Sequence, residues 1–191
     1  MIQFTCEQET TRISRKKMGL PNERPFVKGI TAVPKDQIME EEPPMEIYEI
    51  TSDKKSLLPL LLLADEQEEM VDRYLSRGRM FVLDDHGIRC ECVVTDEGNG
   101  ILEIKNIATV PDDQGKGYAK ALIRYLLDTF RDRFTVLQVG TGDSPLTIPF
   151  YEKCGFVRSH VIPNFFTEHY DHPIIECGIR LTDMVILRRP F

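Results

Sequence analysis

Long apolar segments are missing from this sequence of 191 residues. A helix that spans a bilayer needs about 20 consecutive apolar residues, whereas the run from Leu57 to Leu63 is far shorter and contains Pro59. The N-terminus has no apolar segment of the kind found in secretory signal peptides. We therefore expect a cytoplasmic protein that does not bind membranes.

Cysteine motifs are also absent. The five cysteines are scattered and include no Cys-x-x-Cys pair. Cys90 and Cys92 fall on one face of a predicted strand, which favours buried free thiols over a redox pair. One cluster of potential metal ligands, which lacks the second half of a zinc pattern, comprises His169, His172, Glu176 and Cys177. We expect no metal site.

Positive charge is scarce, with 24 basic residues against 31 acidic ones and a net charge of -7. This balance argues against a nucleic-acid-binding surface and favours cationic or amine-bearing partners. The hydrophobic fraction of 41% is enough for one full core.

Pro43 and Pro44 mark the first division, between an N-terminal extension (residues 1–44) and a main domain (residues 45–191). The extension carries more apolar side chains than a solvated linker usually does: Ile2, Phe4, Ile13, Met18, Leu20, Phe26, Val27 and Ile30. We expect it to pack on the main domain or on a second subunit of a homodimer.

The main domain alternates strands and helices. Helical periodicity predicts a helix or a helix pair over 56–77, a helix after residue 117 and a helix that ends before Gly155. The predicted strands are 45–50, 79–83, 88–95, 101–110, 134–139, 156–162 and 183–188. Short turns rich in Asp and Gly imply antiparallel hairpins. The pattern predicts an α/β (α+β) fold with a mixed, mostly antiparallel sheet flanked by helices.

The most informative segment joins strand 101–110 to an amphipathic helix and reads Gln114-Gly115-Lys116-Gly117-Tyr118-Ala119. Backbone N–H groups at the start of a helix have no helical acceptor and suit an anion such as a pyrophosphate. Glycines let the backbone approach a phosphate closely, and Lys116 adds positive charge. A tight connection without a ligand explains the glycines equally well. Neither a P-loop nor a dinucleotide-binding fingerprint is present.

A second motif lies downstream, Phe150-Tyr151-Glu152-Lys153-Cys154-Gly155-Phe156. It is typical of a helix end capped by glycine with a new strand behind it. The two motifs, in this order and at this separation, resemble the GNAT superfamily of acyl-CoA N-acyltransferases over residues 45–191. In more detail, the chain is similar to a bacterial branch of N-acetyltransferases.

This resemblance implies an acetyl-CoA donor and direct attack by an amine in a ternary complex. It also implies that two central strands, 101–110 and 134–139, splay apart at a bulge. The alternation of Leu102 and Ile104 resumes out of phase at Ile107, which is a sign of such a bulge. The residues implied to bind the coenzyme are Ile107, Ala108, Thr109, Val110, Gln114, Gly115, Lys116, Gly117, Tyr118, Ala119, Lys120 and Ser144.

The resemblance assigns the general acid to Tyr151, which would protonate the leaving thiolate. Glu103 is the expected base, with His160, His169 and His172 as alternatives, since a histidine pKa suits base catalysis near neutral pH. A glutamate that only pairs with Lys105 on a strand face remains an alternative.

The connection 160–183 is aromatic and acidic and is expected to form the floor of a pocket for a cationic amine. Phe165, His169 and Tyr170 are the expected substrate-binding residues. Together these features predict an N-acetyltransferase for a primary amine of a small molecule or a peptide. Two rivals remain open: a catalytically silent GNAT-fold module for acyl-CoA binding or assembly, and a generic nucleotide-binding α/β protein.

Overall fold

The computed structural model describes residues 45–191. The predictions for residues 1–44, including a homodimer formed through them, lie outside the described residues. The strands are β1 (Glu46–Ile50), β2 (Arg79–Asp84), β3 (Ile88–Asp96), β4 (Ile101–Thr109), β5 (Val136–Gly142), β6 (Val157–Ile162), β7 (Ile175–Glu176), β8 (Ile179–Arg180) and β9 (Met184–Pro190). The helices are η1 (Lys54–Leu57), α2 (Leu58–Leu61), α3 (Glu68–Leu75), η2 (Pro111–Asp113), α4 (Tyr118–Phe130), α5 (Thr147–Lys153) and α6 (Phe165–His169).

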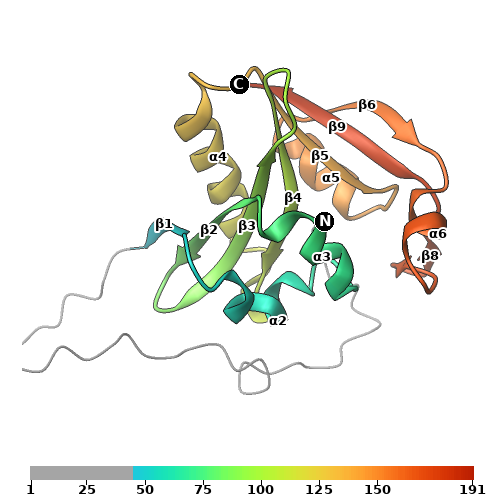
Figure 1. Ribbon diagram of the computed structural model, residues 1–191, viewed down its shortest axis with the longest axis horizontal. Coiled ribbons are helices and arrows are strands. Elements are labelled where there is room, and N and C mark those ends of the chain that lie inside the picture. The colour runs from blue at the N-terminus through green and yellow to red at the C-terminus, as the bar shows by residue number, and fades with distance from the viewer. Residues whose placement is uncertain (1–44) are drawn as a thin grey trace, which may run out of the picture.

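The core of the fold is a seven-stranded sheet in the order β1-β2-β3-β4-β5-β9-β6 (Figure 1). Every neighbouring pair is antiparallel except β4 and β5, which are parallel and joined by the crossover helix α4. β7 and β8 form a separate hairpin. The predicted mixed, mostly antiparallel sheet is confirmed.

The centre of the sheet is irregular. Val93 faces Asn106 across β3 and β4, but Val94 faces Ile104, so Lys105 is an extra residue that forms a bulge. Because of this bulge, Leu102, Ile104 and Ile107 all join the same core cluster. β4 pairs with β5 only over 101–104 and 136–139, and the two strands then separate. The predicted bulge and the splayed central strands are confirmed.

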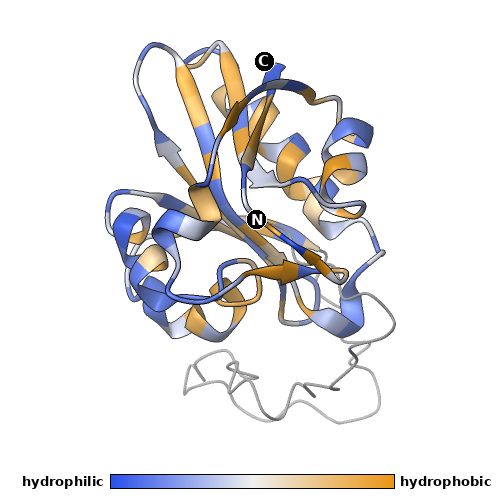
Figure 2. Ribbon diagram, turned by 90° about the vertical axis from the view of Figure 1, so that its right-hand side faces the viewer, coloured by the Kyte–Doolittle hydropathy of each residue, from blue (hydrophilic) through white to orange (hydrophobic). Residues whose placement is uncertain are grey.

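Helices cover both faces of the sheet. On one face, α4 and α5 bury residues such as Leu122, Leu126 and Ile148 against the central strands. On the other face, η1, α2 and α3 pack on Met80, Val82 and Val93. Figure 2 shows the strands largely in the hydrophobic colours and the turns in the hydrophilic ones. Burial of each large apolar side chain contributes about 1.5–3 kcal/mol, so the sheet is held from both sides.

Two segments carry detail that the sequence left open. Of the two alternatives for 56–77, one helix or a helix pair, the structure has separate helices, and the break between Leu61 and Glu68 places Asp65 beside the hydroxyl of Tyr170. The connection 160–183 contains α6 and the β7–β8 hairpin, which enclose a small core of Phe166, Ile174 and Leu181. A local core of this kind depends on tertiary contacts, so a sequence pattern does not reveal it. Within residues 45–191, no helix has the length and apolar character needed to cross a membrane.

Candidate active site

The glycine turn leaves backbone donors accessible at the start of α4. Gly115 and Gly117 have φ angles of 79° and 90°, and a Cβ built on either would meet nothing within 4 Å. The first helical hydrogen bond runs from Ala121 N to Gly117 O at 2.9 Å. The preceding N–H groups, those of residues 118–120, donate to no carbonyl within residues 45–191. Together with the helix dipole, they suit an anionic ligand.

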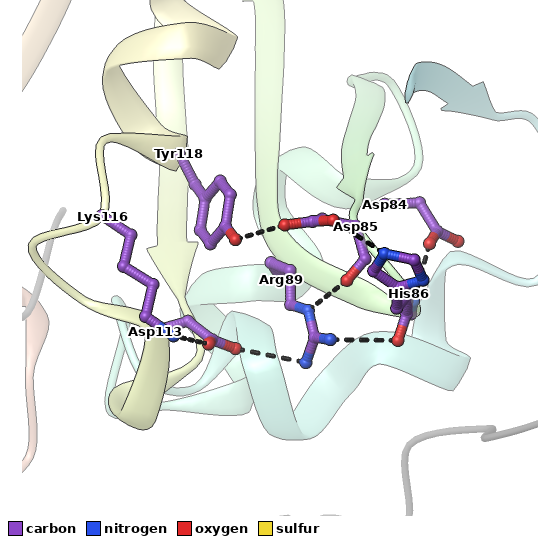
Figure 3. A network of polar contacts seen from close by, with 8 residues as sticks. Asp84, Asp85, His86, Arg89, Asp113, Lys116 and Tyr118 are labelled. Atoms are coloured by element: carbon purple, nitrogen blue, oxygen red, sulfur yellow. Dashed lines mark hydrogen bonds and ion pairs between the residues drawn. The ribbon is translucent and has the colours of Figure 1, made fainter. Parts of the chain in front are cut away.

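A polar network fixes this turn to the β2–β3 turn (Figure 3). The Tyr118 hydroxyl donates to Asp85 Oδ2 at 2.5 Å, and this hydrogen bond raises the pKa of Tyr118 to about 12. Arg89 Nη1 lies 3.4 Å from Asp113 Oδ2, and Lys116 Nζ lies 2.7 Å from Asp113 Oδ1. The Asp113 carboxylate therefore partly neutralises the positive charge of Lys116.

A cavity of about 210 Å³ lies beside the glycine turn, between α4 and the end of α5. Of the predicted coenzyme-binding residues, its walls include Thr109, Gln114, Gly115, Gly117, Tyr118, Ala119 and Lys120. The remaining walls include Phe150, Lys153 and Cys154, from α5 and its C-terminal cap, which belong to the second sequence motif but were not predicted to bind the coenzyme. Because most of its walls come from residues with a predicted coenzyme-binding role, we refer to it as the coenzyme cavity.

Five predicted coenzyme-binding residues do not line that cavity. Ile107, Ala108 and Val110 are buried as whole residues, at most 2% exposed, on the part of β4 that no longer pairs with β5 and just after it. Ser144 is also buried, and its hydroxyl accepts the N–H of Leu146 at 3.1 Å. The fifth is Lys116, whose ammonium group pairs with Asp113 as described above.

Tyr151 lies on α5 and is fully buried. Its ring packs edge-on against Phe150, with centroids 5.2 Å apart, and against Phe156, 5.6 Å apart. Gly155 ends the helix with a φ of 86°, and Phe156 N donates to Tyr151 O at 3.0 Å. The second sequence motif thus forms the expected glycine-capped helix end.

A second cavity, of about 270 Å³, opens on the opposite face of the sheet. Because it contains two residues with a predicted substrate-binding role, we call it the acceptor cavity. Its apolar walls come from α3, α6 and the strands, and are formed by Met70, Ile104, Ile162, Phe165, Met184 and Ile186. Phe165 and Tyr170, two of the three residues predicted to bind substrate, are among its lining residues. His169 is not among its lining residues, because its ring stacks on Phe165 at 4.4 Å and its Nδ1 lies 2.9 Å from Phe165 O.

Three polar side chains form a row across the acceptor cavity. Glu103, Gln138 and Arg188 occupy paired positions on β4, β5 and β9. Gln138 donates its amide to Glu103 Oε2 at 2.7 Å and accepts from Arg188 Nε, also at 2.7 Å. Lys105 contacts the other oxygen of Glu103 at 2.7 Å. We refer to Glu103, Gln138 and Arg188 as the polar row.

Asp65 contributes a carboxylate from the opposite wall of the same cavity. The hydroxyl of Tyr170 donates to Asp65 at 3.1 Å, and that of Tyr74 lies 3.5 Å from its other oxygen. Burial raises the pKa of Asp65, which is 8% exposed. Asn106, just beyond the bulge, donates to Tyr74 at 2.8 Å.

Of the three histidines considered as bases, only His160 lines the acceptor cavity. His172 lies near the protein surface, 3.3 Å from Glu66 and 2.5 Å from Asp171. Asp65, Gln138 and Arg188 are cavity residues that no sequence motif indicated. The only available signal for the last two was their spacing on strands whose register becomes known from the structure.

The two cavities share no lining residue and lie on opposite faces of the sheet. Between them, β4 and β5 are no longer paired. A thioester held on the helix-α4 side could therefore meet a nucleophile held on the other side at this gap. Within residues 45–191, no group of three His, Cys, Asp or Glu side chains is arranged to hold a metal ion.

Comparisons with known proteins agree with this geometry. Residues 76–158 match the model of the acetyltransferase (GNAT) domain. The uncharacterized N-acetyltransferase YvbK of Bacillus subtilis is 34% identical over 155 residues, which cover 75% of this chain and 93% of that protein.

Two further proteins carry more specific names. Spermidine N(1)-acetyltransferase of Vibrio cholerae is 29% identical over 119 residues, which cover 53% of this chain and 64% of that protein. The crystal structure of a GNAT family acetyltransferase from Elizabethkingia anophelis with acetyl-CoA bound superposes with a TM-score of 0.73 at 31% identity. That match covers 77% of this chain and 98% of the other.

Proposed function

Since the chain belongs to the GNAT acetyltransferase family, we propose that it is an N-acetyltransferase that transfers the acetyl group of acetyl-CoA to a primary amine. A relative of the same fold holds acetyl-CoA, which supports this donor. The similarity to a spermidine acetyltransferase supports a small-molecule amine as acceptor.

The glycine turn fits the donor. Accessible N–H groups at the start of α4, with open space where Cβ atoms would stand, suit the pyrophosphate of coenzyme A. The unpaired edge of β4 beyond Ile104 offers backbone groups to the amides of pantetheine. Acetyl-CoA, when bound, supplies the activated acyl group.

The observation that carries the proposal is the gap between β4 and β5 with a cavity on each side. An amine in the acceptor cavity can attack the thioester carbonyl directly while the donor stays in place. A new C–N bond forms, the C–S bond breaks, the amine loses a proton and the thiolate gains one.

Glu103 and Tyr151 are assigned to the two proton transfers. Glu103 lines the acceptor cavity and takes the proton of the amine, directly or through water. Its contacts with Lys105 and Gln138 hold the carboxylate in one orientation. Tyr151, on the α5 side, gives its proton to the leaving thiolate.

The rival function is a catalytically silent module that binds acyl-CoA or serves assembly. A module of this kind has no need for an open acceptor site, whereas this domain retains a cavity of about 270 Å³ with a carboxylate on each wall. The open cavity favours the enzyme.

The test is release of free CoA by the purified full chain with acetyl-CoA and a panel of amines: amino acids, polyamines, aminoglycosides and peptide N-termini. We expect turnover of at least one small-molecule class, and loss of the acidic limb of the pH–rate profile in the Glu103→Gln variant. Glu97→Gln is the matched control, since Glu97 also contacts Lys105, at 3.5 Å, but does not line the cavity. Acetyl-CoA binding without turnover of any amine would favour the silent module.

A further inference from the structure

The charged groups of the acceptor cavity do not balance one another locally. Apart from His160, four ionisable acidic and basic side chains line the cavity: Asp65, Glu103, Lys105 and Arg188. Glu103 and Lys105 form an ion pair at 2.7 Å and largely neutralise each other. Within the part of the chain that the structure describes, neither Asp65 nor Arg188 takes part in an ion pair. The Asp65 carboxyl group and the Arg188 guanidinium group therefore remain for a ligand.

Arg188 is held in a way that leaves most of its donors available. Its Nε donates to Gln138 Oε1 at 2.7 Å, and Gln138 is itself fixed by its bond to Glu103. Neither Nη atom has a hydrogen-bond acceptor within residues 45–191. A guanidinium group with two parallel N–H groups matches a carboxylate in geometry as well as in charge.

Asp65 offers the complementary site. Its carboxylate is buried beside the aromatic rings of Tyr74 and Tyr170, whose hydroxyls donate to it. Carboxylate and aromatic groups together suit an ammonium group. Because Tyr74 also bonds Asn106, directly after the bulge, the Asp65 site adjoins the gap between β4 and β5.

The sheet sets the distance between these groups. Glu103 and Arg188 lie two strands apart in the polar row, and neighbouring strands are about 4.8 Å apart, so their Cα atoms are separated by roughly 10 Å. Side chains that reach toward a shared ligand shorten this span. A molecule with an amine and a carboxylate a few bonds apart can therefore contact both ends of the row.

We propose that the acceptor is a zwitterion of the amino-acid class, with its carboxylate bound by Arg188 and its amine placed between Asp65 and Glu103. This inference rests on the proposed function and narrows its substrate class. The carboxylate contact fixes the amine at the gap between β4 and β5, where the acetyl group is transferred. A polyamine lacks the carboxylate and would place a cation against Arg188 instead.

The test uses matched pairs of probes that differ only in the carboxylate: L-phenylalanine against 2-phenylethylamine, and L-lysine against 1,5-diaminopentane. Calorimetry on the CoA-loaded full chain measures binding, and mass spectrometry with acetyl-CoA measures product. We expect at least one amino acid to bind about tenfold or more tightly than its decarboxylated partner, as a charge-assisted hydrogen-bond pair provides.

Arg188→Gln should bring that ratio close to one, and Arg188→Lys should give an intermediate ratio, because lysine keeps the charge without the paired donors. Arg131→Gln is the control and should keep the wild-type ratio, since Arg131 lies on the surface after α4 and pairs with Asp128. If Arg188 only supports Gln138, the variant weakens both members of a pair equally and the ratio survives, which overturns the inference.

The inference is also overturned if no standard amino acid binds the CoA-loaded protein, or if the decarboxylated partners bind equally well. Failure of the proposed function gives a different pattern. In that case the Arg188-dependent binding ratio is present, but no acetylated product forms from any probe.

Discussion

The two parts of the Tyr151 side chain have different roles: the ring packs in the core, and the hydroxyl is the proposed general acid. The ring is fully buried between Phe150 and Phe156, so its packing requires an aromatic group at this position. A phenylalanine keeps those edge-on contacts and removes only the hydroxyl. This separation of roles makes the position suitable for testing the general acid.

We predict that Tyr151→Phe lowers kcat about 100-fold and leaves acetyl-CoA affinity nearly unchanged, which is the usual scale for loss of a general acid. Steady-state kinetics and calorimetry measure the two quantities. Tyr125→Phe is the control, since Tyr125 contacts the same core from α4, with its ring 5.7 Å from Phe81. Wild-type turnover in Tyr151→Phe would reduce Tyr151 to a packing residue.

Glu91 carries a buried carboxyl group that has no role in the proposed reaction. It is 0% exposed, opposite Ala108 on β4, and burial raises its pKa from 4.5 to about 8. Between these two pH values the unfolded chain releases a proton that the folded chain retains. Folding stability therefore falls as pH rises through this window, by up to about 1.4 kcal/mol per pH unit.

Glu91→Gln should remove this dependence. We expect the variant to melt at a higher temperature than the wild type at pH 8, and the difference to shrink toward pH 5, where the wild-type side chain is protonated in the folded state. Thermal melts across pH 5–8 measure the effect. Glu69→Gln, on the exposed face of α3, should show no such trend. A pH-independent difference between Glu91→Gln and wild type would contradict the expected titration.

At the scale of elements, polar contacts within the domain hold the turn before α4 in place. It is tied through Asp113 to Arg89 and through Tyr118 to Asp85, so the β2–β3 turn supports it from the side (Figure 3). Its donors are therefore in place before an anion arrives, and little conformational entropy is lost on binding.

We predict that Gly117→Asp raises the Kd for acetyl-CoA by about 100-fold or more, because a carboxylate would occupy the open space in front of the N–H groups and repel a phosphate. Isothermal calorimetry measures the change. Gly98→Asp is a matched control, since Gly98 also has a positive φ, of 78°, and open space around its Cβ position, but lies in the β3–β4 turn. An unchanged Kd for acetyl-CoA in Gly117→Asp would show that the glycine turn does not bind the donor.

Local patterns predicted the elements that have strong periodicity. The spacing of Leu122, Ile123 and Leu126 predicted α4, and the phase change between Ile104 and Ile107 predicted the bulge. At 56–77 the pattern left one helix or a helix pair open, because the apolar run continues from Leu61 to Ala64, where the helix has already ended. Helical periodicity alone does not show where tertiary contacts interrupt a helix.

The acceptor cavity was harder to predict than the glycine turn. The turn is contiguous in sequence, and its chemistry follows from two glycines and a helix start. The polar row instead joins Glu103, Gln138 and Arg188, which meet only through the register of three strands. A single sequence does not contain that register, so only Glu103 could be named in advance.

At the scale of the whole molecule, the prediction for residues 1–44 still stands on sequence alone. Burial of five of their apolar side chains would contribute several kcal/mol, at about 1.5–3 kcal/mol each, before the entropy of ordering. We expect deletion of residues 1–44 to leave a folded domain that binds acetyl-CoA but has a lower melting temperature or a different mass in light scattering. A truncated protein that keeps both values would show that the extension does not pack on anything.

The two cavities share no lining residue, although β4 contributes to both. The acceptor cavity is otherwise lined from α3, α6, β5, β6 and β9, and the coenzyme cavity from the glycine turn, α4 and α5. A substitution that reshapes one leaves the walls of the other intact. After gene duplication, descendants of such a chain could therefore acquire new acceptors by changes in residues 157–188 while the donor site stays under purifying selection. Because the sheet separates the two cavities, acceptor preference can change in evolution without a change in donor binding.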